Sequence, residues 1–419
     1  MDEASAEMSL LVLLVGAAVV VAMLGEALLS RFKLPGIVFH MLTGFGLRLV
    51  DERFSFLSPR AETVFELLAS LGVIVLLFRV GLESDALRLV RKLKRASPMW
   101  LGSVALSGGL GFAACYVILG YGIVPSLAVA ISLTATSVGI PAAIWQEKRA
   151  IASDEGDLFL DVAELDDVSG IVLMVLLFSL LPAPGAAPPA DDSVAAALAL
   201  LAVKLVGFVG FCWLFARFAE RRLARSIERI ERPPHPMLTI AGIGIVIAGV
   251  AGFLGFSVAI GAFFAGLVFS RDPHKVRFGA SFNAVHDLFA PFFFIGVGMQ
   301  LTPSSLGGAL LPALVLLVVA VVGKVLGTAA PALLSLSWAS ALTLGVSMVP
   351  RAEISLIIAK RGAAEGGPVS PELFSALVLV SAVTCLVTPI VLGPLLERSL
   401  PHRGGRRRRR RKHRRARKR

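Results

Sequence analysis

Charged residues, cysteine and tyrosine are all scarce in this chain of 419 residues. Only 17% of the residues are Asp, Glu, Lys or Arg, whereas a soluble domain carries about 25%, so an ordinary water-soluble domain is excluded. The three cysteines, Cys115, Cys212 and Cys385, lie in apolar segments without metal-ligand or disulfide spacing. No nucleophile–base set or phosphate-binding loop is visible, and we therefore expect neither an enzyme nor a cofactor.

Long apolar runs are what the chain has in abundance. Hydrophobic residues make up 56% of the chain, its mean hydropathy is +0.81, and runs of about 20 residues recur along it, each long enough to cross a bilayer as a helix. We predict an all-α polytopic membrane protein with inverted repeats. The thirteen expected spans lie near 8–30, 34–50, 61–82, 97–120, 123–147, 157–182, 193–217, 237–252, 254–271, 281–301, 306–334, 337–360 and 370–397.

The connections between these spans sort by charge. Lys and Arg gather at 31–33, 88–95, 148–149, 217–232, 271–277 and 403–419, and the alternate connections at 51–60, 182–192 and 363–371 have no such excess. Basic connections stay cytoplasmic, which places the N-terminus outside the cell and the C-terminus in the cytoplasm. We expect the protein in the inner or plasma membrane of the cell. The acidic residues before the first run are unlike the basic start of a cleaved leader, so we expect that helix to be retained.

Residues 403–419 hold 13 of the 41 Lys and Arg, leaving 28 basic against 29 acidic residues in the rest of the chain. The sequence predicts a transmembrane unit over 1–402 and a disordered basic cytoplasmic tail over 403–419. Next to a membrane, anionic lipid headgroups are the expected partner of such a tail, and nucleic acid is not.

Two expected helices contain residues that interrupt a helix. The first carries Thr134-Ala-Thr-Ser-Val-Gly-Ile-Pro141, and the other carries Gly345-Val-Ser-Met-Val-Pro-Arg-Ala-Glu353. Proline removes an N–H and clashes with a carbonyl one turn back. Interrupted helices in matching positions of two inverted halves point to a binding site at the middle of the membrane.

Asp166 and Asp167 lie side by side in the helix expected after the first break. A carboxylate at this depth costs roughly 3 kcal/mol on insertion scales, so the pair indicates a task that needs it, and binding a cation and protons in exchange is such a task. On a helical wheel the two side chains point about 100° apart. We expect Asp167 to bind the cation and the proton, and Asp166 to be a second metal ligand and charge partner.

Three more charges lie at membrane depth: Lys324, Arg351 and Glu353. Lys324 needs a carboxylate, and both Asp166 and Glu353 are deep enough to be its partner; we expect Asp166. Arg351 and Glu353 are interpreted as a structural network that satisfies the free ends of the interrupted helix, with a direct transport role as the alternative.

Hydroxyl and further acidic groups complete the expected site. Thr136 and Ser137 can give oxygens to a hard cation or can satisfy backbone groups freed at Pro141. Asp157, Asp161 and Glu164 recur at i, i+4 and i+7, which predicts either a cytoplasmic funnel for cations or a solvated helix start.

The chain resembles the monovalent cation:proton antiporter family, in the branch called cation:proton antiporter-2. The motifs that carry the resemblance are Leu77-Phe-Arg-Val-Gly-Leu-Glu83, Thr134-Ala-Thr-Ser-Val-Gly-Ile140, Leu165-Asp-Asp-Val168, Gly255–Gly266, Pro291–Met299 and Met348-Val-Pro-Arg-Ala-Glu353. The chain departs from the family at Ala352, often Gly, and at Val38–His40, where a Gly-Glu pair is common.

The resemblance implies a homodimer whose protomers hold a dimerisation domain and a six-helix core that moves like an elevator, here expected over about 61–182 and 281–361. It implies that Asp167 carries ion and proton, that Asp166 pairs with Lys324, and that exchange is electrogenic. The expected function is exchange of a monovalent cation, Na+ before Li+ or K+, for protons. A K+/H+ antiporter, a sodium-coupled symporter and a channel on the same scaffold are the alternatives.

Overall fold

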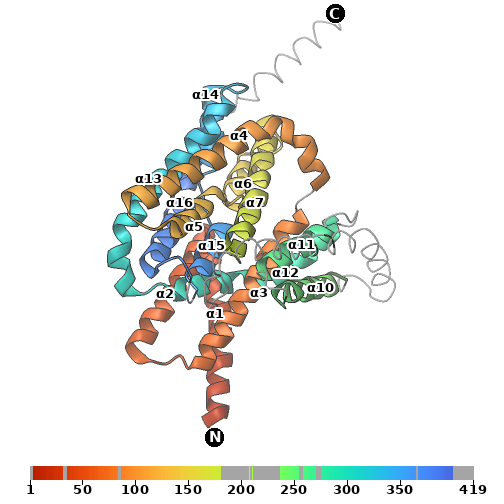
Figure 1. Ribbon diagram of the computed structural model, residues 1–419. Helices are drawn as coiled ribbons and strands as arrows, with labels where there is room; N and C mark the ends of the chain where they lie inside the picture. Colours follow the sequence, from red (N-terminus) through yellow and green to blue (C-terminus); the bar gives the residue numbers. More distant parts are fainter. Residues whose placement is uncertain are drawn as a thin grey trace, which may run out of the picture.

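The computed structural model describes residues 3–31, 35–83, 86–180, 236–253, 258–269, 275–364 and 367–399, together with Gly207 and Gly210. Its regular elements over these ranges are helices, without a β-strand (Figure 1). Seven of the described segments are long and apolar enough to cross a membrane by length and composition. This confirms the all-α polytopic class. The span expected at 193–217 and the tail at 403–419 lie outside the described residues.

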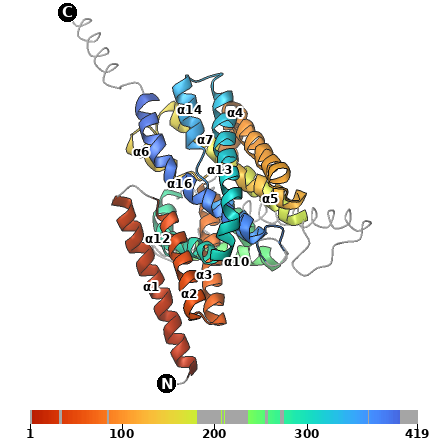
Figure 2. The same ribbon diagram turned by 90° about the vertical axis from the view of Figure 1, so that its left-hand side faces the viewer.

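Six helices form what we call the first bundle, in the lower half of Figures 1 and 2. Helix α3 packs against α11 and α12, α12 packs against α2, and α10 and α1 pack at the edges. The members are α1 (Glu3–Arg31), α2 (Gly36–Phe54), α3 (Pro59–Glu83), α10 (Pro236–Phe253), α11 (Val258–Phe269) and α12 (Lys275–Met299).

The remaining helices form the second bundle, in the upper half of both views. Its main contact joins α4 to α13, and α16 packs against α13, α14 and α15. The members are α4 (Ala86–Ala113) with its π-helical end at Ala114–Ile118, α5 (Ile123–Thr134), α6 (Gly139–Glu147), α7 (Asp154–Leu180), α13 (Pro303–Ala332), α14 (Trp338–Ser347), α15 (Glu353–Gly362) and α16 (Pro371–Ser399).

The two bundles draw a different boundary from the one we expected between core and scaffold. Helices α3 and α12, expected in the core, pack with α2, α10 and α11, whereas α16, expected in the scaffold, packs with α13, α14 and α15. The sequence could not predict this boundary, because a membrane helix is apolar both where it faces protein and where it faces lipid. Its hydropathy therefore does not indicate which helices it packs against.

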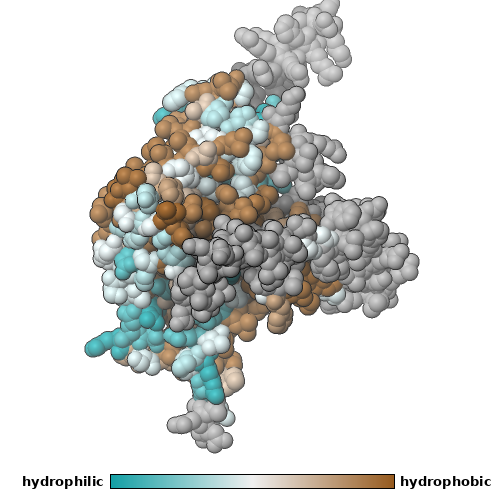
Figure 3. Space-filling view, in the orientation of Figure 1, coloured by the Kyte–Doolittle hydropathy of each residue, from teal (hydrophilic) through white to brown (hydrophobic). Residues whose placement is uncertain are grey.

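Glycines set the close approach of α4 to α13. A Cβ added to Gly327 would lie 2.5 Å from the carbonyl oxygen of Gly102, and one added to Gly323 would lie 2.7 Å from Cα of Ser107. The opposite face of α13 exposes large apolar side chains at every fourth residue, from Leu310 through Leu314, Val318 and Val322 to Leu326. One face of α13 therefore packs against α4 and the other is suited to lipid. Apolar residues cover much of the described surface of this bundle in Figure 3.

Both helix interruptions are present where the Gly, Ser and Pro residues predict them. Residues 135–138 separate α5 from α6, and residues 348–352 separate α14 from α15. The two non-helical stretches meet at what we call the crossing, where the Ser137 N–H donates to the carbonyl oxygen of Pro350 at 2.7 Å. Unwound backbone at membrane depth is tolerated where it is enclosed by protein in this way.

A serine pair joins the two half-helices on the other side of the crossing. The hydroxyl oxygens of Ser132 in α5 and Ser355 in α15 lie 2.8 Å apart, and each hydroxyl also donates to the other residue's carbonyl oxygen, at 3.1 and 2.7 Å. Both serines are buried. The half-helices α5 and α15 are thus held together by polar contacts that water does not reach.

Candidate cation-binding site

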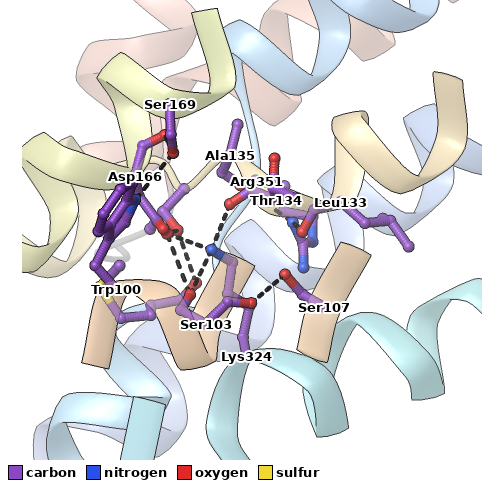
Figure 4. Close-up of polar contacts among 12 residues, drawn as sticks. Trp100, Ser103, Ser107, Leu133, Thr134, Ala135, Asp166, Ser169, Lys324 and Arg351 are labelled. Atoms are coloured by element: carbon purple, nitrogen blue, oxygen red, sulfur yellow. Dashed lines mark hydrogen bonds and ion pairs between the residues drawn. The ribbon is translucent and has the colours of Figure 1, made fainter. Parts of the chain in front are cut away.

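A buried ion pair lies beside the crossing (Figure 4). Asp166, on α7, and Lys324, on α13, are both fully buried, and the Lys324 ammonium contacts Asp166 Oδ2 directly. The Thr136 hydroxyl, from the first interruption, donates to the same carboxylate oxygen at 2.8 Å. The expected pairing of Lys324 with Asp166 is thus present, and Thr136 lies beside it as a donor to Asp166, whereas its role as a cation ligand stays a prediction.

Lys324 makes two further contacts that the sequence reasoning missed. Its ammonium donates to the Ser103 hydroxyl of α4 at 2.9 Å and to the backbone carbonyl of Thr134 at the end of α5. With Asp166, these are three acceptors for the three hydrogens of an ammonium group. The available signal for Ser103 was its polarity within the apolar run of α4, and Ser107 one turn away shares it.

Several buried polar atoms have no hydrogen-bond partner among the described residues, and three of them are oxygens of the expected site residues. They are Asp166 Oδ1, Asp167 Oδ1 and Ser137 Oγ, all of them buried. Polar atoms in protein interiors are nearly always partnered, so such a group of acceptors needs an explanation. Carboxylate and hydroxyl oxygens are the ligands that hard cations prefer.

Glu353 begins α15 and is half-buried. Its carboxylate acts electrostatically on Asp167. A third carboxylate therefore lies within electrostatic reach of the aspartate pair.

Arg351 is fully buried, and its guanidinium forms hydrogen bonds at the first interruption rather than at the end of its own helix. Its guanidinium donates to the carbonyl oxygens of Leu133 and Ala135, the latter at 3.1 Å, and to that of Ala320 at 3.3 Å. These carbonyls at the end of α5 have lost their helical partners. The network expected at the ends of its own interrupted helix is therefore not what Arg351 forms: its guanidinium caps α5 instead, and no described contact joins it to Glu353.

A cavity of about 820 Å³ lies between the two bundles and leads to this region. Ser137 and Glu353 line it on the side of the second bundle, and His40 and Phe294 line it opposite. At its rim Lys148 donates to Glu397 at 2.5 Å, and this hydrogen bond raises the pKa of Lys148.

The acidic stripe of α7 does not line that cavity. Asp157 is exposed, Asp161 is buried and Glu164 is half-buried. The glutamates on the wall are instead Glu26, Glu147, Glu353 and Glu397. The role of the stripe as a funnel stays a prediction, and these four glutamates are the ones that the cavity exposes.

A second cavity, of about 660 Å³, lies at the opposite end of the same interface. Along α12 the first cavity meets His286 to Phe294 and the second meets Phe293 to Gln300, just past the helix end. Along α15 the first meets Glu353 and the second meets Ile357 and Lys360. The two cavities therefore follow one another along α12 and α15, and Ser137 and Glu353 line the first of them.

The model of the transmembrane sodium/hydrogen exchanger family matches residues 17–398. This chain belongs to that family. The high-affinity Na+/H+ antiporter NhaS3 of Synechocystis is 28% identical over 368 residues, 86% of this chain and 77% of the relative. The K+/H+ antiporter subunit KhtU of Bacillus subtilis is 26% identical over 397 residues, 93% of each protein.

The fold of the sodium proton antiporter MjNhaP1 from Methanocaldococcus jannaschii matches with a TM-score of 0.66 at 16% identity, covering 94% of this chain and 99% of that one. The family resemblance read from the motifs is confirmed. The chain is a multi-pass membrane transporter that exchanges a monovalent cation for protons, and it is not an enzyme. Its relatives divide between Na+ and K+, so they leave the cation open.

Proposed function

We propose that this antiporter exchanges Na+ for protons, and that Asp167 binds the cation and the proton in turn. The observation that carries the proposal is that three oxygens of the expected site residues, Asp166 Oδ1, Asp167 Oδ1 and Ser137 Oγ, are buried without a hydrogen-bond partner among the described residues. A single carboxylate that holds either Na+ or a proton couples the two fluxes by competition. Transport therefore falls at acidic pH, where protons occupy the site.

Asp166 has a different role in this proposal. Its Oδ2 atom is engaged by Lys324 and Thr136, and its Oδ1 atom is available to the cation as a second metal ligand. A cation that binds both aspartates has to compete with the Lys324 ammonium for Asp166. Competition at Asp167 alone exchanges one proton for one Na+ and moves no net charge, so the electrogenic exchange of this proposal requires a second proton to move for each Na+.

The decisive experiment replaces the binding carboxylate. Asp167→Asn in proteoliposomes with a pH-sensitive dye should abolish Na+-driven proton movement, because the amide neither titrates nor carries a charge for Na+. Asp154→Asn, at the exposed start of the same helix, should exchange like wild type. Wild-type rates in Asp167→Asn would overturn the assignment.

A comparison of transport rates with different cations identifies the transported cation. Proton flux is measured with Na+, Li+ and K+ in turn, with and without an imposed voltage. Saturable exchange with Na+ and Li+ at lower concentrations than with K+ supports a sodium site, and dependence on the voltage supports electrogenic exchange. The reverse order of cations would make the protein a K+/H+ antiporter, as the Bacillus subtilis relative is named.

The assembly in this proposal is a homodimer in the cell membrane, with the N-terminus outside and the tail of residues 403–419 near anionic headgroups in the cytoplasm. The second bundle acts as the moving core and the first as the scaffold. The two cavities between them support this division, because sliding of one bundle along the other can widen one cavity while narrowing the other.

A further inference from the structure

The first helix interruption and the two aspartates account for the cation, but nothing assigned so far explains the contact of α4 with Lys324. Ser103 is fully buried, and its hydroxyl oxygen lies 2.9 Å from the Lys324 ammonium and 3.4 Å from Asp166 Oδ2. The side chain therefore lies between the two members of the ion pair. Figure 4 shows it reaching toward both from below, on α4.

The position of Ser103 is set by backbone packing. The Gly102–Gly327 contact brings α4 so close to α13 that a Cβ on Gly327 would also lie 3.0 Å from Cα of Ser103. Ser103 is thus presented to Lys324 by a rigid helix pair, and α4 brings no charged group to the ammonium at this point.

The hydrogen bonds of Lys324 divide into one to a charged acceptor and two to neutral ones. Asp166 is the charged acceptor, and the neutral ones are the Ser103 hydroxyl and the Thr134 carbonyl. A buried ammonium without acceptors is strongly disfavoured. When the cation draws Asp166 away, only the two neutral acceptors can keep Lys324 in place.

We propose that Ser103 is a positioning residue for exchange, which together with the Thr134 carbonyl holds the Lys324 ammonium while Asp166 turns to the cation. This inference rests on the proposed role of Asp166 as a cation ligand. Without the Ser103 hydroxyl, Lys324 depends more on Asp166 and competes harder with the cation for it. Ser103 therefore sets how readily the site accepts Na+.

The test measures the Na+ dependence of exchange in Ser103→Ala. A hydrogen bond to a charged group contributes about 1.5 to 3 kcal/mol, so we expect the apparent KM for Na+ to rise about tenfold or more, with a smaller change in the maximal rate. Ser107→Ala removes a buried hydroxyl one turn away on the same helix and should leave the KM within about twofold of wild type. An unchanged KM in folded Ser103→Ala would overturn the inference.

A binding measurement separates this inference from the proposed function. The rise in Tm of the detergent-purified protein on adding NaCl, with choline chloride as the salt control, reports Na+ binding without transport. Ser103→Ala should need about tenfold more Na+ for the same rise, and this difference should vanish when Lys324 is also replaced by Met. A wild-type protein that Na+ does not stabilise contradicts the proposed sodium site. If Na+ raises the Tm of wild type and of Ser103→Ala with the same concentration dependence, the inference about Ser103 is contradicted and the proposed sodium site is not.

Discussion

At the scale of single residues, the stability of the site depends on two buried charges that neutralise each other. Lys324 and Asp166 are fully enclosed and held to each other, so each compensates the other. Removing one partner of a buried pair leaves an uncompensated charge and costs about 3–5 kcal/mol, whereas replacing both by apolar or neutral groups is often neutral or stabilising.

Lys324→Met should therefore lower the Tm of the purified protein markedly, because Asp166 loses its cation. The double variant Asp166→Asn/Lys324→Met should recover most of the loss, since neither group then carries a charge. The comparison is made by thermal unfolding in detergent at neutral pH. Equal Tm values for the single and double variants would show that the pair contributes nothing by its charge.

The sequence could predict the Lys324–Asp166 ion pair, but it could not predict which uncharged groups surround the pair. A lysine in the middle of an apolar helix needs a carboxylate, and only Asp166, Asp167 and Glu353 were deep enough to offer one. Ser103 gave no comparable signal, because a serine in a membrane helix can satisfy its hydroxyl on its own backbone, as Ser107 does with the Ser103 carbonyl. Deciding which serine faces the site requires the packing of α4 on α13.

At the scale of elements, the α4–α13 contact carries the site. Lys324 comes from α13 and Ser103 from α4, and the glycines between them permit a backbone approach that no side chain would allow. The helix interruptions were predictable from Pro141, Pro350 and their neighbours, whereas the use of Arg351 to cap the other interrupted segment was not, because it joins residues more than 200 positions apart.

Gly327→Ala tests this contact. The added Cβ would meet the Gly102 carbonyl oxygen at 2.5 Å, and overpacking of this kind destabilises by about 1–3 kcal/mol. Gly307→Ala on the same helix meets nothing within 4 Å and should be neutral or slightly stabilising, because alanine favours a helix over glycine. Thermal unfolding of both variants decides the matter, and equal stability would mean that α4 and α13 can separate without cost.

At the scale of the whole molecule, each bundle has ion pairs of its own among the described residues. Arg60 on α3 pairs with Glu7 on α1 inside the first bundle, and the Lys324–Asp166 pair lies inside the second. The interface between the bundles instead holds the two cavities. The molecule thus has two internally tied bodies and a hollowed contact between them, which is the arrangement that relative sliding needs.

A cross-link between the bundles should stop exchange if they slide. Glu66 on α3 and Lys360 on α15 line the second cavity from opposite sides and attract each other electrostatically. In a background with alanine at the three native cysteine positions, Glu66→Cys/Lys360→Cys should exchange before treatment. It should lose exchange on reaction with a short thiol-cleavable bifunctional reagent and regain it on reduction.

The matched control is Glu7→Cys/Arg60→Cys, which joins α1 to α3 within the first bundle. It should react with the same reagent and stay active. Full exchange by the cross-linked Glu66→Cys/Lys360→Cys protein would show that transport proceeds with the two bundles fixed together at this end.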